Sequence, residues 1–455
     1  MNWHSTLAPR AVARLFVKPL ERFLRVEAAG GVLLLLAAAT ALLLANSPWA
    51  SWYDALWSTP LTLRVGSLVS TEPVRFWIND GLMTFFFLVV GLEVKREMHD
   101  GALADRRAAV LPVAAALGGV LVPAAFYLLL NSAAELRQGW AIPTATDIAF
   151  AVGVLSLLGS RVPSALRALL LTLAVVDDLV AVMVIAGFYA ADIAPIGLLI
   201  AAAGVLVALA LRRLTCRNAL VYVVPGAMIW IGLKYAGIHP TVAGVILGLL
   251  TPSVICSGAD HAPRNRPART RRELPAIGST QQRSQRAARA LTAHLRRAHL
   301  AQRDALSPAA RIEAVLHPWV AYGLMPLFAL ANAGVALPGA GLRAIYAPTL
   351  AAGILLALAL GKPLGILLTT WLCTRARLTT LPAGIDWRHM LVLGCLGGIG
   401  FTMSIFIGNL AFTAPSLLAT AKLSVLIGSA LSASAGLLLG WSLLRAGARG
   451  RTAPP

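Results

Sequence analysis

The stretch LTLAVVDDLVAVMVI, residues 171–185, places two adjacent carboxylates, Asp177 and Asp178, in the middle of an apolar run. The run extends over about residues 168–190, which is long enough for a helix that crosses a lipid bilayer. A charged side chain at the centre of a bilayer costs about 2.5 kcal/mol or more. Two neighbouring carboxylates also repel each other when both are ionised. The stretch therefore predicts a membrane helix with an ion- or proton-handling site; a structural pair against a polar partner helix is the alternative.

The composition is that of a polytopic helical membrane protein. Of the 455 residues, 58% are hydrophobic and 13% are charged, and the mean hydropathy is +0.76. These values exclude an ordinary soluble domain. The formal net charge of +20 would suggest nucleic acid as a partner of a soluble protein. Here the basic residues fall mostly between apolar segments, where the preference of cytoplasmic loops for Lys and Arg explains them, so we expect no nucleic acid.

The cysteines indicate neither a disulfide framework nor a zinc site. They lack a CxxC pair and have no metal-like spacing to histidine. The four are Cys216, Cys256, Cys373 and Cys395. We expect a protein that needs no cofactor.

Apolar segments recur along the chain, and we predict twelve membrane crossings. They lie at about residues 28–45, 76–98, 108–130, 140–158, 168–190, 196–211, 219–236, 238–250, 314–335, 348–372, 390–412 and 417–444. Twelve crossings leave every strongly basic loop on one side of the membrane, which puts both termini in the cytoplasm. The predicted fold class is therefore an all-α polytopic membrane protein.

The predicted organisation has five parts. They are an amphipathic cytoplasmic N-terminal segment (1–27), helices one to eight (28–250), a basic cytoplasmic loop (251–307), helices nine to twelve (308–446) and a cytoplasmic tail (447–455). The N-terminal segment lacks the apolar core of a signal peptide. The loop holds eleven arginines and could form a surface helix at residues 287–306 that suits an anionic membrane surface. A solvated, partly disordered loop is the alternative.

Two predicted helices contain sequences that interrupt a helix. The fourth opens with AIPTATD, residues 141–147, where Pro143 removes a backbone donor and Thr146 and Asp147 supply oxygens for a cation. The eleventh contains GGIGFTMS, residues 397–404, whose glycines either kink the helix or permit close packing. Each interrupted helix is the middle one of three crossings, and the two triplets start on opposite sides. We therefore predict an inverted repeat with two discontinuous helices that cross at the midplane.

A lysine lies in the middle of the tenth predicted helix. Lys362 either snorkels to the interface or neutralises a carboxylate and carries a proton. The predicted repeat brings it within reach of Asp147, Asp177 and Asp178. Carboxylate and carbonyl oxygens are ligands for hard cations, and the sequence offers no soft ligands for a transition metal.

Two other classes of protein fit part of this pattern. An intramembrane aspartyl protease needs two carboxylates that face each other from different helices, whereas Asp177 and Asp178 are about 100° apart around one helix. Asp147 could be the second member, but Lys362 would be an unfavourable neighbour. A membrane scaffold that presents the basic loop leaves the charges within the membrane unexplained. We therefore expect a transporter and not an enzyme.

The chain resembles the NhaA-type sodium/proton antiporters in six stretches that occur in the same order. They are GLEVKRE (91–97), WAIPTATDIAF (140–150), VVDD (175–178), HPWVAY (317–322), GKPLG (361–365) and GIGFTMSIF (398–406). That family is a known example of the inverted repeat. The resemblance implies exchange of Na⁺ or Li⁺ for H⁺ across the bacterial inner membrane, driven by the proton gradient, regulated by pH and carried out by a homodimer. Another monovalent cation is the alternative substrate.

The resemblance also implies roles for single residues. Asp177 and Asp178 match the paired carboxylates at which Na⁺ and protons compete. Thr146 and Asp147 match residues at the unwound part of the fourth helix, and Lys362 matches a membrane-buried lysine.

Three residues are candidate pH sensors, and two of them lie at the predicted inner rim. Glu93 and Glu97 match part of the family's pH-sensing cluster, with a simple solvated rim as the alternative. His317 could titrate near neutrality, or it could be structural. The arginine-rich connection between the eighth and ninth helices departs from the family, where this connection is short.

The predicted loop after the first helix, about residues 46–75, contains a candidate dimer contact. Residues 61–65 alternate like a short strand, and four aromatic residues precede them as an interfacial belt. These are Trp49, Trp52, Tyr53 and Trp57. An exposed strand pair at about residues 61–69 could extend its ladder with a second copy of the chain.

Overall fold

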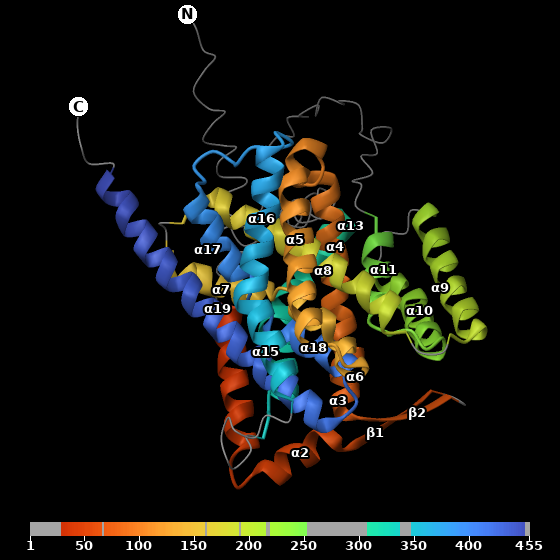
Figure 1. Cartoon of the computed structure of the whole chain (residues 1–455). Coiled ribbons are helices and arrows are strands. Elements are labelled where there is room, and N and C mark those ends of the chain that lie inside the picture. Colours follow the sequence, from red (N-terminus) through yellow and green to blue (C-terminus); the bar gives the residue numbers. More distant parts are fainter. Residues whose placement is uncertain are drawn as a thin grey trace, which may run out of the picture.

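The structure is a computed structural model that describes residues 29–65, 68–159, 162–190, 193–214, 219–252, 307–336 and 347–450. Over these ranges the chain is predominantly helical, and one two-stranded hairpin is present. Figure 1 shows a bundle of long helices with the hairpin projecting from one end. The predicted N-terminal segment, the surface helix at 287–306 and nearly all of the basic loop lie outside the described residues.

The helices have the length and composition of membrane spans. In the described part of the chain, seven helices could cross a membrane, or up to ten if each bent pair is one span. The seven are Val74–His99, Arg107–Leu130, Ser164–Phe188, Pro195–Arg213, Pro308–Asn332, Pro348–Arg375 and Pro415–Leu443. Large apolar side chains such as Leu129 and Leu438 point out of the bundle, 83% and 73% exposed, which suits a surface that faces lipid. The predicted class, an all-α polytopic membrane protein, is confirmed.

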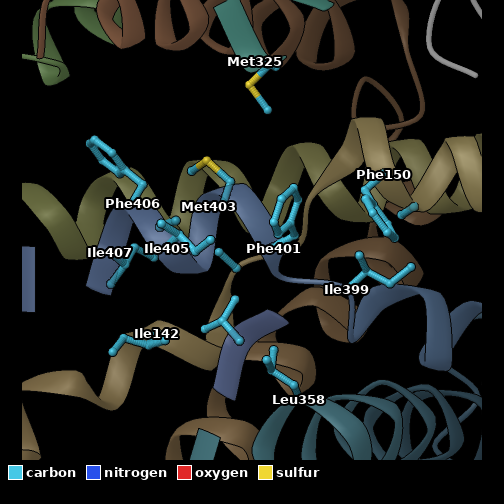
Figure 2. Packing of buried hydrophobic residues seen from close by; sticks show 14 of the residues in the cluster. Ile142, Phe150, Met325, Leu358, Ile399, Phe401, Met403, Ile405, Phe406 and Ile407 are labelled. Carbon is cyan, nitrogen blue, oxygen red and sulfur yellow. The ribbon is translucent and has the colours of Figure 1, made fainter. Parts of the chain in front are cut away.

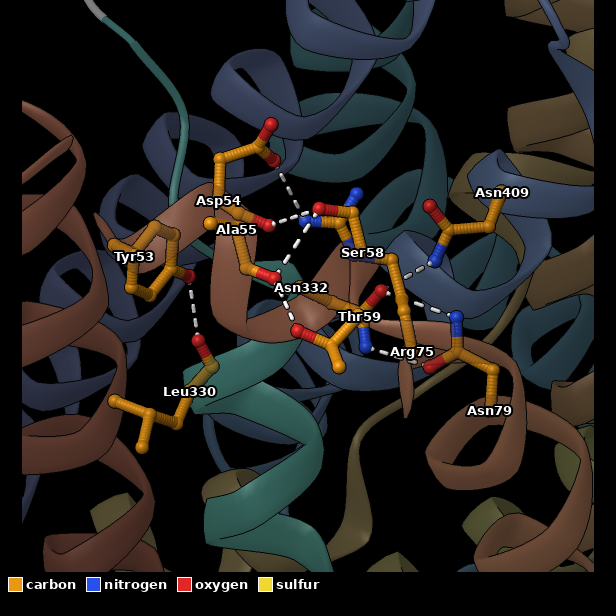
Figure 3. Close-up of polar contacts among 10 residues, drawn as sticks. All are labelled: Tyr53, Asp54, Ala55, Ser58, Thr59, Arg75, Asn79, Leu330, Asn332 and Asn409. Atoms are coloured by element: carbon orange, nitrogen blue, oxygen red, sulfur yellow. Dashed lines mark hydrogen bonds and ion pairs between the residues drawn. The ribbon is translucent and has the colours of Figure 1, made fainter. Parts of the chain in front are cut away.

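The segment after the first helix, Ala29–Ala45, is more ordered than the predicted loop. It forms α2 (Ala50–Ser58) at 114° to the first helix, then β1 (Pro60–Val65) and β2 (Leu68–Pro73), which pair antiparallel. The predicted strand is thus present, and Trp52, Tyr53 and Trp57 of the predicted aromatic belt lie in α2, with Trp49 at its N-cap. Tyr53 of α2 donates a hydrogen bond to Leu330 O (Figure 3), which holds α2 against the bundle.

The remaining elements follow in order. The first set is α3 (Val74–Phe76), η1 (Trp77–Leu82), α4 (Met83–Asp100), α5 (Arg106–Leu130), α6 (Ala134–Arg137), η2 (Gln138–Thr144), α7 (Ile148–Leu157), α8 (Ser164–Phe188), α9 (Pro195–Arg213), η4 (Ala219–Tyr222), α10 (Val223–Tyr235) and α11 (Val242–Leu250). The second set is α13 (Pro308–Trp319), η5 (Val320–Leu324), α14 (Met325–Asn332), α15 (Pro348–Leu356), η7 (Ala357–Gly361), α16 (Lys362–Arg375), α17 (Trp387–Gly397), α18 (Phe401–Ala411) and α19 (Pro415–Gly450).

The helix α13 begins earlier than the predicted start at about residue 314. Ser307 Oγ accepts the Ala310 N–H at 3.2 Å, and Pro308 occupies the first helical position. A serine cap followed by proline is a favourable helix start. The cap, rather than the apolar content, sets this boundary.

Close contacts between small residues fix the heights of the helices around the site. A side chain at Gly118 of α5 would overlap the Gly365 carbonyl of α16, and one at Gly91 of α4 would lie 2.8 Å from Val245 O of α11. Glycine at these positions lets the backbones touch. Because Gly365 is one turn after Lys362, the first contact also fixes the height of this lysine.

A network of asparagine side chains joins three elements at the end of the bundle that carries the hairpin. Asn332 donates to Asn79 Oδ1 at 2.7 Å, and Asn409 donates to Asn332 Oδ1 at 3.0 Å (Figure 3). Asn332 is buried. The network ties α14 to η1 and to α18.

Candidate functional site

The paired aspartates lie in the interior of the bundle. Asp177 and Asp178 of α8 are 1% and 0% exposed. Asp177 Oδ2 is 3.0 Å from Lys362 Nζ, and the lysine is also 0% exposed. The lysine therefore does not reach solvent, and its charge is matched inside the protein, as burial requires.

Lys362 uses its donors on three oxygens. Besides Asp177 it donates to Thr144 O at 2.7 Å and to Thr146 Oγ1 at 2.6 Å. An ammonium group has three protons, so its hydrogen-bonding capacity is filled. Thr144 is the last residue of η2, and its carbonyl belongs to a helix end, where cations are favoured.

Thr146 connects the lysine to the first carboxylate. Its hydroxyl lies 2.6 Å from Asp177 Oδ2 and 3.0 Å from Gly397 O. The hydroxyl has one proton and serves one of these acceptors at a time. Thr146 therefore links the η2–α7 connection to α8 and to the end of α17.

Two helix interruptions lie against each other beside this group. The pairs η2–α7 and α17–α18 are each separated by three residues, 145–147 and 398–400, and are bent by 47° and 43°. The Asp147 N–H donates to Ile399 O at 2.7 Å. The chain segments 145–147 and 398–400 are therefore in direct contact.

Asp147 caps two helices at once. Its Oδ1 accepts the Phe150 N–H of α7 at 3.0 Å, and its Oδ2 accepts the Thr402 N–H of α18 at 3.0 Å. The Thr402 hydroxyl also donates to Oδ2. A helix N-terminus carries unpaired N–H groups and a partial positive charge, so one carboxylate stabilises both helix starts.

Asp178 differs from its neighbours because neither of its carboxylate oxygens has a hydrogen-bond partner among the described residues. Four further charged side chains interact with it electrostatically: Asp177, Glu93, Asp147 and Lys362. Asp177 Oδ1 is also without a hydrogen bond in that part of the chain. A buried carboxylate without donors is costly, and a proton or a bound cation would relieve the cost.

Apolar side chains surround the contact between the two interruptions, as Figure 2 shows for α18 and its neighbours. The rings of Phe87 and Phe328 lie 5.5 and 6.2 Å from the ring of Phe406. The buried apolar side chains in this region include Ile142, Phe150, Leu358, Ile399, Phe401, Met403 and Phe406. This packing lowers the local dielectric and strengthens every electrostatic interaction within it.

A narrow crevice of about 50 Å³ lies beside Asp147. Its lining includes the predicted pH sensors Glu93 and His317 together with Asp147 and Thr402. Glu97 is absent from this lining. It accepts hydrogen bonds from Thr172 Oγ1 at 2.8 Å and from Ala102 N at 3.0 Å. Glu97 is therefore bonded to α8, five residues before Asp177.

Sequence reasoning missed two polar groups of this region. Glu313 of α13 is 7% exposed and forms an ion pair with Arg96. Its signal was available, because Glu313 and His317 are four residues apart and so share one face of a helix. Thr402 stands in the stretch GIGFTMSIF, but its bond to Asp147 crosses 255 residues of sequence.

The described residues contain no cluster of three His, Cys, Asp or Glu side chains close enough to hold a metal ion. A cation at Asp177 and Asp178 would complete its shell with hydroxyl, carbonyl or water oxygens, which hard cations accept. Cys373 and Cys395 are free thiols, and the other two cysteines lie outside the described ranges.

Comparison with known proteins shows the family. A family described as Na⁺/H⁺ antiporter 1 matches residues 21–439. Na(+)/H(+) antiporter NhaA 2 of Sorangium cellulosum is 51% identical, over 98% of this chain and 94% of the relative. Its namesake in Pseudomonas putida is 49% identical over 99% and 97%, and Na(+)/H(+) antiporter NhaA of a Janthinobacterium species is 49% identical over 96% of both. Antiporters are transporters and not enzymes. This chain belongs to the Na⁺/H⁺ antiporter 1 family.

Proposed function

We propose that this protein exchanges Na⁺ for H⁺ across a membrane, and that Asp177 and Asp178 are the residues at which the two ions compete. The observation that carries this assignment is the burial of Asp178 without a hydrogen-bond donor for either oxygen among the described residues, beside the ion pair of Asp177 and Lys362. Binding of either a proton or a cation stabilises such a carboxylate. Because either ion satisfies the same oxygens, binding one displaces the other.

Lys362 and Thr146 couple the two processes. Na⁺ at Asp177 replaces the ammonium group as the partner of the carboxylate, so Lys362 must move or lose its proton. The hydroxyl of Thr146 can rotate so that its proton bonds to Gly397 O instead of Asp177 Oδ2. This rotation frees a lone pair of Asp177 Oδ2 for the cation. Asp147 keeps both helix starts stable during the exchange. No cofactor takes part.

Everted membrane vesicles that hold a pH gradient test this proposal. Adding Na⁺, Li⁺ or K⁺ across a pH series should collapse the gradient with Na⁺ and Li⁺, read by a fluorescent dye. A response to K⁺ alone would replace the proposal with a potassium/proton antiporter. A gradient indifferent to all three cations would reject cation/proton exchange.

We further propose that the proton gradient drives transport in the bacterial inner membrane and that pH regulates it from the inner rim. The crevice that joins Glu93 and His317 to Asp147 supports a sensing role for the first two. Glu97 would act through Thr172 on the site helix. Regulation and cation binding would then share one connected set of residues.

The proposed topology has twelve crossings, both termini in the cytoplasm and an inverted repeat. Its five parts are 1–27, 28–250, 251–307, 308–446 and 447–455, as predicted. In this arrangement the bent pairs η2–α7 and α17–α18 are two discontinuous spans that cross at the midplane. The contact between their interruptions supports this arrangement.

We also propose a homodimer joined through the hairpin. Both strands are exposed along an edge, and Leu61, Leu63 and Val69 are 45%, 47% and 55% exposed. An exposed strand edge can pair with a second copy. Lipid would cover the remaining apolar surface of the bundle.

A further inference from the structure

Two serines of α19 contact the places where the backbone of the site departs from regular α-helix. We infer that Ser429 and Ser432 are positioning residues of the proposed antiport site, one for the start of α18 and the other for the turn before Lys362. This inference rests on the proposed function. Both serines are 2% exposed, and neither is hydrogen-bonded to Asp177 or Asp178.

Ser429 is the neutral cap of α18. Its Oγ accepts the Phe401 N–H at 3.1 Å, while Asp147 accepts the next N–H, that of Thr402. The first N–H groups of a helix have no partner within the helix. Without Ser429, the buried Phe401 N–H would compete with Thr402 for the carboxylate of Asp147. The serine therefore leaves Asp147 free to cap α7 and α18 symmetrically.

The turn before Lys362 leaves one carbonyl without a backbone donor. This turn, η7, is a π-helix in which the Lys362 N–H donates to Ala357 O, five residues back. The next donor in the same register would be the N–H of residue 363, but Pro363 has none. The carbonyl of Leu358, four residues before the lysine, therefore has no backbone N–H as its hydrogen-bond donor.

Ser432 supplies a donor to that carbonyl. Its Oγ lies 3.4 Å from Leu358 O, and a side chain at Gly398 would overlap both atoms. The hydroxyl, the free carbonyl and the residues between α17 and α18 therefore meet at one point. A contact at this point sets where Lys362 begins α16.

The two serines act from a single rigid element. They are three residues apart and so lie on the same face of α19. One faces the interruption that Asp147 caps, and the other faces the turn that carries Lys362. A shift of α19 would therefore displace both the helix start that Asp147 caps and the turn that carries Lys362. In this way α19 would affect the site although it supplies none of its charged residues.

Four variants test the inference: Ser429→Ala, Ser432→Ala, Ser429→Thr and the control Ser424→Ala. Ser424 is similarly buried on the same helix, but among the described residues its hydroxyl donates to Thr420 O of its own helix and to no other element. Losing the cap in Ser429→Ala should raise KM for Na⁺ by up to about fivefold, the equilibrium ratio that corresponds to the stability typically lost with one helix cap. Ser432→Ala should shift the pH profile, because Lys362 is displaced. Ser429→Thr keeps the acceptor and should restore KM.

Hydrogen–deuterium exchange gives a readout that does not depend on transport. Peptides covering 398–406 should exchange faster in Ser429→Ala, and those covering 355–364 should do so in Ser432→Ala, with no such change in Ser424→Ala.

If both variants match Ser424→Ala in KM, pH profile and exchange, the inference is wrong while the proposed function stands. A lower melting temperature with unchanged KM, pH profile and local exchange would assign the serines a merely structural role. If wild type fails to transport, the proposed function fails, and the exchange measurements still decide whether the serines hold the two backbone segments.

Discussion

Lys362 Nζ and Asp177 Oδ2 lie 3.0 Å apart, with no exposed surface on either side chain. Burying two charges is costly, and their attraction offsets the cost only when the remaining donors are also satisfied. Here Thr144 O and Thr146 Oγ1 accept the other two protons of the lysine. The pair therefore ties α8 to α16 and to the end of η2, and any cation that reaches Asp177 has to displace it.

Removing the lysine should cost both stability and transport. Lys362→Ala leaves a buried carboxylate without its partner, an effect typically worth about 3–5 kcal/mol, so the melting temperature should fall with the exchange rate. Lys362→Arg keeps the charge, but arginine does not release its proton in proteins, so the pH profile of exchange should shift. Thermal melting and dye-monitored exchange across a pH series measure both effects. Unchanged melting and pH dependence in both variants would mean that the lysine has no part in the site.

The two aspartates should respond differently to neutralisation. Asp178→Asn should abolish Na⁺ binding and exchange, yet its melting temperature should not fall, because the lost oxygen has no hydrogen-bond partner among the described residues. Asp177→Asn should abolish or severely impair exchange and should also lower the melting temperature, since Lys362 loses its countercharge. Isothermal titration with Na⁺ and thermal melting on the same preparations separate the two cases. Wild-type turnover in folded Asp178→Asn would refute the assignment of this residue.

The fold class and the central charged residues could be predicted from the sequence, because the bilayer interior solvates charged groups poorly. An ionisable residue within twenty apolar ones is expensive, so Asp177, Asp178 and Lys362 stand out without any structure. The expectation that Lys362 meets a carboxylate rests on the same cost. The structure brings Lys362 and Asp177 together as expected.

Other features depend on contacts that no local pattern encodes. That Asp147 caps both α7 and α18 depends on Thr402, 255 residues away. The α2 helix was expected as a loop, because its aromatic residues favour an interface without fixing a conformation. The role of Ser432 follows only once the π-turn leaves Leu358 O without a donor. Tertiary contacts decided each of these, and sequence spacing alone carries no information on them.

Glu97 offers a test of the pH-sensing proposal. If this residue acts through α8, Glu97→Gln and Thr172→Val should shift the activation pH in the same direction, because Thr172→Val removes the donor of the 2.8 Å hydrogen bond and Glu97→Gln removes the charge of its acceptor. Apparent Na⁺ affinity at the optimal pH should stay near that of wild type. Exchange in everted vesicles over a pH series measures both. A shift with Glu97→Gln but none with Thr172→Val would make Glu97 a rim charge that acts independently of α8.

Deleting residues 60–70 should yield monomers that still transport. The cut is geometrically mild, because the Val74 N–H already donates to Thr59 O at 3.0 Å and three residues can bridge the gap. Lys234→Gln is the matched control: it breaks the 2.8 Å ion pair with Glu72 but leaves both strands in place, so it should remain dimeric. Native mass spectrometry gives the oligomeric state. Dimers that survive the deletion would place the contact elsewhere.

The arginine-rich insertion should tune regulation and leave ion binding intact. Its two ends meet, because the Ala309 N–H donates to Pro252 O at 3.2 Å and Lys95 binds the carbonyls of Leu249 and Thr251. A short Gly/Ser linker can therefore replace residues 257–306 without pulling α11 away from α13.

The expected effect of that replacement is electrostatic. Residues 257–307 contain eleven arginines against three acidic residues, and each basic residue near an anionic membrane surface contributes about 1 kcal/mol, screened by salt. The linker variant should shift the activation pH or the response to anionic lipid, and high salt should reduce its difference from wild type. A full-length loop with all eleven arginines replaced by glutamine should show the same shift, which separates charge from connectivity. Proteoliposomes of defined lipid composition, assayed for exchange and for Na⁺ affinity at the optimal pH, give both numbers. Loss of Na⁺ binding in a stable, monodisperse linker variant would show that the insertion belongs to the ion site after all.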